Sequence, residues 1–241
     1  MVRNIERILA KITTLCQEEK ENEAEVLVRD ALVKDPNNTD LLTKLGIIQV
    51  RLCRDDEAEA TFRNVLKQDR DHEEAICSLG RLLDQSLRSE EAEALYRNYL
   101  QRKPSHCAVD DLCRLLLTED REEEALDIAR NHMKKFPTEA GAYDALRYTL
   151  VVIEDKLSGE LDDKRESATV ALNLLINLIE QLELFNKMKQ ELDVTPLLER
   201  ELLDEKSRVA GEIDYVLSSA RIRNLSIPDE ILTRIDTQLE L

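Results

Sequence analysis

Residues 40–106 read DLLTKLGIIQVRLCRDDEAEATFRNVLKQDRDHEEAICSLGRLLDQSLRSEEAEALYRNYLQRKPSH. A pattern of small and large residues returns in them after 34 positions: Leu42-x2-Leu45-Gly46 is followed by Ile76-x2-Leu79-Gly80, and Ala58-x3-Phe62 by Ala92-x3-Tyr96. This period is typical of a unit of two helices that can bury its apolar face only against its neighbours. The stretch therefore predicts a stack of helix pairs.

The position of Ala58 and Ala92 in this pattern is also filled by Ala outside the stretch, at Ala24 and Ala125. Small residues such as Ala58 and Gly46 are expected where the two helices of a unit cross, because a longer side chain would force the helix axes apart. We predict repeats at residues 5–38, 39–72, 73–105 and 106–138, and the start of a fifth at 139. The fourth departs from the pattern, with Leu112-Cys113 in place of Leu-Gly and Ala129 in the aromatic position.

The pattern resembles the tetratricopeptide repeat (TPR) family, whose motif combines Leu-Gly, a later Ala, an aromatic residue and a closing Pro. Pro36, Pro104 and Pro137 stand at the expected closing positions of the first, third and fourth repeats, and Arg70 stands where Pro would be expected in the second. The resemblance implies an all-α fold, a right-handed α-α superhelix of about four to five helix pairs. It also implies C-terminal helices outside the repeat motif that cap the array.

Three domains follow from where the motif ends: a repeat array at residues 1–153, an inserted loop at 154–165 and a helical extension at 166–241. In the insert, Ser158-Gly159 and Asp162-Asp163 interrupt the apolar period, which indicates the end of a lengthened helix followed by a loop. The extension predicts a long helix at 164–192. A second helix should start at Thr195-Pro196 and a short third one after Ser226-Ile227-Pro228, because Thr caps helices and Pro suits their first position.

The long helix carries a wide apolar stripe over residues 171–192, including Leu175, Leu182 and Phe185. A stripe of this width is buried on two sides. Two interpretations follow, a terminal helix packed within the chain, or a helix that pairs with its copy in a homo-oligomer.

Composition limits the function further. Among 241 residues there are five Gly, five Pro and no Trp, which suits long helices joined by short turns. The net charge of −17 opposes binding to nucleic acids and to anionic lipids, and it would steer basic proteins or peptides toward the chain. Nucleic acid and membrane are therefore not expected as partners.

The cellular compartment is expected to be the cytoplasm. The first seven residues place charges among apolar residues, unlike a signal peptide, and no apolar run is long enough to span a membrane. The five cysteines are odd in number and mostly fall at apolar positions of helical patterns, so we interpret them as small buried hydrophobic residues in a reducing compartment.

No enzymatic motif is recognisable: the sequence has no Gly-rich phosphate loop, no G-x-S-x-G and no Cys-x-x-Cys. His106, Cys107 and Cys113 lie close in sequence, and His106 and Cys113 would share a helix face, but their irregular spacing gives little support for zinc. We predict no catalytic residue, no metal site and no cofactor. The hypothesis that the protein is an enzyme would rest on this cluster alone.

The candidate binding surface follows from the family resemblance, because TPR proteins bind extended peptides or helices on the concave side of the superhelix, lined by the first helix of each repeat. Helical spacing assigns nine inner-face residues to this side: Lys44, Ile47, Arg51, Cys77, Arg81, Asp110, Arg114, Asp144 and Tyr148. Arg81 and Arg114 occupy equivalent positions. They predict either a groove that recognises anions, since Arg binds carboxylates bidentately, or internal pairs with Asp110 and Asp144.

Our leading interpretation is a non-enzymatic scaffold or adaptor that binds a peptide or helix of a partner protein on the inner face. One TPR subclass binds the acidic tails of heat-shock chaperones through a Lys/Asn/Arg clamp. Leu9 and Thr13 stand where that clamp needs Lys and Asn, so this particular function is not inferred.

Overall fold

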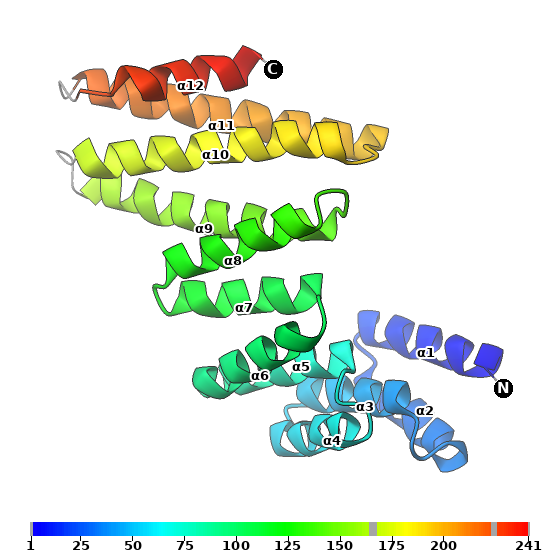
Figure 1. Cartoon of the computed structure of the whole chain (residues 1–241). Coiled ribbons are helices and arrows are strands. Elements are labelled where there is room, and N and C mark those ends of the chain that lie inside the picture. Colours follow the sequence, from blue (N-terminus) through cyan, green and yellow to red (C-terminus); the bar gives the residue numbers. More distant parts are fainter. Residues whose placement is uncertain (1, 164–167, 223–225, 241) are drawn as a thin grey trace. The chain divides into compact units, whose positions relative to one another are not determined.

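The computed structural model describes residues 2–163, 168–222 and 226–240. This part of the chain is almost entirely helical and contains no strand, which confirms the all-α class (Figure 1). The helices are α1 (Val2–Gln17), α2 (Glu21–Lys34), α3 (Thr39–Arg51), α4 (Asp55–Gln68), α5 (Glu73–Gln85), α6 (Ser89–Arg102), α7 (His106–Thr118), α8 (Glu122–Lys135), α9 (Gly141–Asp163), α10 (Ala168–Glu191), α11 (Pro196–Ile222) and α12 (Asp229–Glu240).

The chain divides into two compact units, Met1–Leu115 and Leu116–Leu241. The first holds α1 to α6 and most of α7, and the second holds the remaining helices. The boundary expected from the repeat motif, after residue 153, lies inside α9 and therefore inside the second unit. The division of the fold and the end of the repeat motif fall at different places in the sequence.

In the first unit the helices pack against their neighbours along the chain. The helices α3, α5 and α7 begin at the first residues of the predicted second, third and fourth repeats. Each start is fixed by a side chain that accepts a hydrogen bond from a backbone N–H of the first turn. The hydrogen bonds run from Leu41 N–H to Asn38 Oδ1 (3.0 Å), from Ala75 N–H to His72 Nδ1 (3.3 Å) and from Ala108 N–H to Ser105 Oγ (3.0 Å). Equivalent positions of successive repeats therefore cap α3, α5 and α7.

The helices of a pair cross where the small residues were expected. A Cβ atom added to Gly46 would lie 2.5 Å from a ring carbon of Phe62, and one added to Gly80 would lie 2.2 Å from the Tyr96 ring. Both aromatic side chains are buried. The predicted steric role of the two glycines is confirmed.

The turn between the two helices of a pair contains a residue other than glycine in the left-handed backbone conformation. Positive φ values near 58° occur at Glu19, Cys53, Leu87 and Asp120, which are spaced like the repeats. After each of these four residues, the next N–H group bonds to the carbonyl five residues earlier at 2.9 Å; the donors are Lys20, Arg54, Arg88 and Arg121. This is the Schellman arrangement that ends a helix and releases the chain into a turn.

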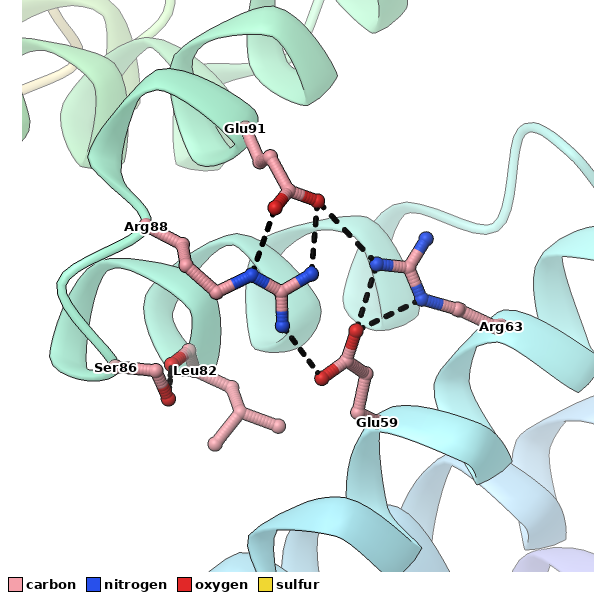
Figure 2. Close-up of polar contacts among 6 residues, drawn as sticks. All are labelled: Glu59, Arg63, Leu82, Ser86, Arg88 and Glu91. Carbon is pink, nitrogen blue, oxygen red and sulfur yellow. Dashed lines mark hydrogen bonds and ion pairs between the residues drawn. The ribbon is translucent and has the colours of Figure 1, made fainter.

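Arginines that follow these turns also connect consecutive repeats (Figure 2). Arg88 Nη1 donates to Glu59 Oε2 of the preceding pair at 2.8 Å, and Arg88 Nε donates to Glu91 at 2.7 Å. Arg63 Nη2 lies 2.6 Å from Glu59 and 3.5 Å from Glu91, so the four side chains form one network. One repeat earlier, Arg54 pairs with Glu25 in the same way.

The second unit corrects one prediction. Residues 154–163, expected to contain the end of a lengthened helix and then part of an inserted loop, are all helical and form the last turns of α9. Ser158 and Gly159 do not end the helix, because Glu154 before them and Leu161 after them are both buried against neighbouring helices. The rest of that expected loop, residues 164 and 165, lies outside the described residues.

A buried polar cluster connects α9 to the two helices that follow it. Arg208 of α11 donates to Glu154 Oε1 at 2.7 Å, and Gln181 of α10 donates to Glu154 Oε2 at 2.7 Å and to Asn177 Oδ1 at 2.9 Å. Glu154, Asn177 and Gln181 are all buried. A buried carboxylate is tolerated when it is paired and hydrogen-bonded, so this cluster fixes three helices to one another.

The apolar stripe of α10 is used inside the chain. Ala171, Leu175, Leu178, Leu182 and Phe185 are all at most 3% exposed, and α10 packs against α9, α11 and α12. The start of α11 at Pro196 is as predicted, with Thr195 Oγ1 accepting a hydrogen bond from Leu198 N–H at 3.3 Å. Across the described residues, no helix is both long and apolar enough to cross a membrane.

Candidate functional site on the first helices of the repeats

Seven of the nine inner-face residues belong to the first unit. Lys44, Ile47 and Arg51 lie on α3, Cys77 and Arg81 on α5, and Asp110 and Arg114 on α7. Asp144 and Tyr148 lie on α9 of the second unit, where Asp144 is exposed and Tyr148 half-buried.

Each of the four cations has an acidic or carbonyl partner. Lys44 forms an ion pair with Glu74 of the next repeat. Arg51 Nη1 donates to the Cys16 carbonyl oxygen at 2.7 Å and lies 3.3 Å from Glu21. These two cations therefore help to join neighbouring helix pairs.

The two equivalent arginines pair differently from each other. Arg114 Nε lies 2.9 Å from Asp110, one of the internal pairs that the sequence allowed. Arg81 Nε lies 3.7 Å from Asp111, a residue that the sequence analysis did not select. Asp144 lies 3.7 Å from Arg147 on its own helix. The face carries alternating charges rather than a row of uncompensated cations.

The arginine side chains remain accessible in these pairs. Their exposed fractions are 54% for Arg81 and 46% for Arg114 and Arg51, whereas the carboxylate of Asp111 is 5% exposed. A half-exposed guanidinium beside a buried carboxylate is held in place, yet it can still donate hydrogen bonds to a carboxylate or carbonyl of another molecule.

Asp111 also belongs to a cluster with two cysteines. One oxygen of Asp111 and the sulfur atoms of Cys77 and Cys107 all lie within 4.8 Å of one another. Cys77 and Asp111 are buried, and Cys107 is exposed. Of the cysteines and histidine that the sequence suggested for a zinc site, only Cys107 takes part; Cys113 is fully buried and belongs to no such group among the described residues.

The cluster was not apparent from the sequence because its members come from two repeats. Cys107 and Asp111 are four residues apart and share a face of α7, and this proximity could have been inferred from the sequence. Cys77 joins them only because α5 lies beside α7 at this register.

The electrostatic environment separates the two thiols. The hydrogen bond between the sulfurs, followed by burial, raises the pKa of Cys77, and the same hydrogen bond lowers the pKa of Cys107. Burial raises the pKa of Asp111, against the opposing effect of Arg81. Cys107 is therefore the first of the two cysteines to ionise.

Comparison with known proteins identifies the repeat. Residues 15–79 match the tetratricopeptide repeat family model, a region that covers α2 to α4 and parts of α1 and α5. No curated protein matches the chain.

Solved structures resemble the chain at low sequence identity. A structure of Naa15/Naa10 bound to HypK-THB has a TM-score of 0.50 at 16% identity, covering 98% of this chain and 39% of that one. A tetratricopeptide repeat protein from Parabacteroides merdae has a TM-score of 0.48 at 17% identity, covering 98% and 97%. The O-GlcNAc transferase of Thermobaculum terrenum has 0.48 at 21% identity, covering 54% of this chain; the matching part spans only 26% of the transferase. These similarities concern the fold.

Proposed function

We propose that this tetratricopeptide repeat protein is a non-enzymatic scaffold that binds a peptide or helix of a partner protein on the inner-face residues of α3, α5 and α7. The observation that supports this most is the series of half-exposed arginines on α3, α5 and α7, each held by an acidic or carbonyl partner. Arginine held in this way loses less rotamer freedom on binding than a free side chain does.

The chemistry of the face favours a partner segment that carries both charges. Arg81 offers a guanidinium to a carboxylate or a backbone carbonyl, while Asp110 and Glu74 offer carboxylates to a Lys or Arg of the partner. The net charge of −17 adds a long-range attraction for basic segments, which acts mainly on the rate of association.

Charge reversal on the inner face tests the proposal. Partners captured from a lysate of the source organism by the wild-type protein are identified by mass spectrometry, and their affinities are then measured for Arg81→Glu/Arg114→Glu. We expect a loss of about tenfold or more in affinity, as for charged groups that contact a partner. Arg81→Gln/Arg114→Gln, which brings no new charge beside Asp111, should show a smaller loss.

The matched control reverses two arginines elsewhere. Arg29 on α2 is 53% exposed and Arg70, after α4, is 76% exposed, so Arg29→Glu/Arg70→Glu changes the net charge equally without touching the inner-face residues. Circular dichroism establishes that all variants are folded. If the inner-face double variant keeps every partner at wild-type affinity, or if the control loses them equally, the proposed site is wrong.

A further inference from the structure

The cluster of Cys77, Cys107 and Asp111 has the ligand chemistry of a metal site. Cys107 and Asp111 lie one turn apart on α7, and Cys77 faces them from α5. Cys107 Sγ lies 3.9 Å from Asp111 Oδ2. In a tetrahedral zinc site, bonds of about 2.3 Å to sulfur and 2.1 Å to oxygen place these two ligand atoms about 3.6 Å apart.

The buried carboxylate supplies a second, independent observation. The Asp111 side chain is 5% exposed, and its partners are Arg81 Nε at 3.7 Å, Cys107 Sγ at 3.9 Å and the thiol of Cys77. Thiols are weak hydrogen-bond donors, and the Arg81 contact is longer than a hydrogen bond, so these partners hold the carboxylate only weakly. A cation bound between Asp111 and the two sulfurs would pair this buried carboxylate directly.

We propose that Cys77, Cys107 and Asp111 bind one zinc ion that connects α5 to α7. Two thiolates and one carboxylate carry three negative charges, zinc supplies two positive charges, and the Arg81 guanidinium beside Asp111 balances the remaining one. Zinc displaces the protons of the two thiols to the solvent and undergoes no redox change.

Accessibility and ligand type agree with this assignment. Cys107 is exposed, so an ion can enter from its side, and a water molecule can occupy the fourth position of the tetrahedron. Thiolate ligands select zinc over magnesium and calcium, which prefer oxygen. The zinc proposal does not rest on the proposed partner binding, but the two sites share Arg81.

Isothermal titration of the metal-free, reduced full-length chain with Zn²⁺ tests the proposal. We expect saturable binding of one ion per chain with proton release, and no uptake of Mg²⁺. Titration with Cd²⁺ should produce the ultraviolet thiolate-to-metal absorption band, which reports sulfur ligands directly. Cys107→Ser and Asp111→Asn should each weaken Zn²⁺ binding by about 100-fold or more, because each removes a ligand.

Cys53→Ser is the matched control, since Cys53 is exposed and lies outside the cluster. It should bind Zn²⁺ like the wild type. Cys107 is also exposed, so its replacement by Ser leaves the fold intact, which circular dichroism verifies. The absence of one-to-one Zn²⁺ binding, or wild-type affinity in either Cys107→Ser or Asp111→Asn, would overturn the assignment.

Discussion

At Gly80 the missing side chain is what allows Tyr96 to lie across α5. The Tyr96 ring is 1% exposed and its hydroxyl donates to the Cys77 carbonyl oxygen at 3.4 Å, so it cannot move aside without losing packing. Two effects of opposite sign meet here: replacing Gly in a helix gains about 0.5–1 kcal/mol, and overfilling a packed site costs about 1–3 kcal/mol or more. The distance of 2.2 Å from a Gly80 Cβ to the ring indicates that the steric cost is the larger.

Gly80→Leu is therefore expected to lower the free energy of unfolding, measured by chemical denaturation, by about 1–3 kcal/mol. Gly211 on α11 provides the control, because nothing lies within 4 Å of the Cβ that it would gain. Gly211→Leu should raise stability by up to about 1 kcal/mol through helix propensity alone. A denaturation midpoint for Gly80→Leu that equals or exceeds the wild type would contradict the packing described for α5 and α6.

Leu87 illustrates a residue held in an unfavourable backbone conformation by the turn around it. It is 93% exposed and has a φ of 59°, so it contributes little packing and bears the cost of the left-handed region. Asn tolerates this region better than Leu does. Leu87→Asn should stabilise the protein by about 0.5–1 kcal/mol in thermal or chemical unfolding.

The same replacement in a helix should act in the opposite direction. Leu203 on α11 is 61% exposed, and Leu203→Asn should destabilise by about 0.5 kcal/mol because Asn is the poorer helix former. Equal effects at the two positions would show that the left-handed backbone of Leu87 is not the cause.

At the scale of elements, arginines after the turns fix each helix pair to the one before it. Glu59 is 22% exposed and accepts hydrogen bonds from Arg88 of the following pair and Arg63 of its own helix. The Arg88 hydrogen bond, and next that of Arg63, lower the pKa of Glu59. A carboxylate with a lowered pKa stabilises the folded state above its unfolded pKa, and this contribution is lost as the pH falls through the folded pKa.

Glu59→Gln is expected to cost about 1 kcal/mol at pH 7, the upper part of the range for partly exposed ion pairs. The difference in free energy of unfolding from the wild type should be constant above about pH 5 and shrink at lower pH. Glu201→Gln, at an exposed position of α11, is the control with the same charge change and should show a difference near zero. Urea denaturation between about pH 3 and pH 7 measures both differences. If the difference for Glu59→Gln is still unchanged at the lowest pH, the ion pairs are not its source.

For the whole molecule, the burial of the apolar stripe of α10 favours the interpretation that this helix packs within the chain. Leu175, Leu178 and Leu182 are 0% exposed because α9, α11 and α12 already cover them. On α10, Ile176 is 38% exposed, and one side chain falls far short of the area that a stable dimer interface buries. The stripe accordingly belongs to the core of the second unit.

Sedimentation equilibrium at high micromolar concentration should therefore give the monomer mass of 27.8 kDa. Leu182→Asp, which places a charge in the covered stripe, should unfold the second unit rather than alter the association state. A concentration-dependent dimer of the folded wild type would revive self-assembly as a function.

The sequence by itself determined the helical class, the starts of α3, α5 and α7, and the small residues at Gly46 and Gly80, because each depends on local spacing or on a repeated position. Tertiary structure alone decided three other features: the helical turns of α9 after Glu154, the pairing of Arg81 with Asp111, and the position of Cys77 beside Cys107. Each depends on side chains that are 27 or more residues apart in sequence. Helix periodicity specifies which face is buried but not which residues of two faces meet, since that depends on the register and crossing angle set by all the packed side chains together.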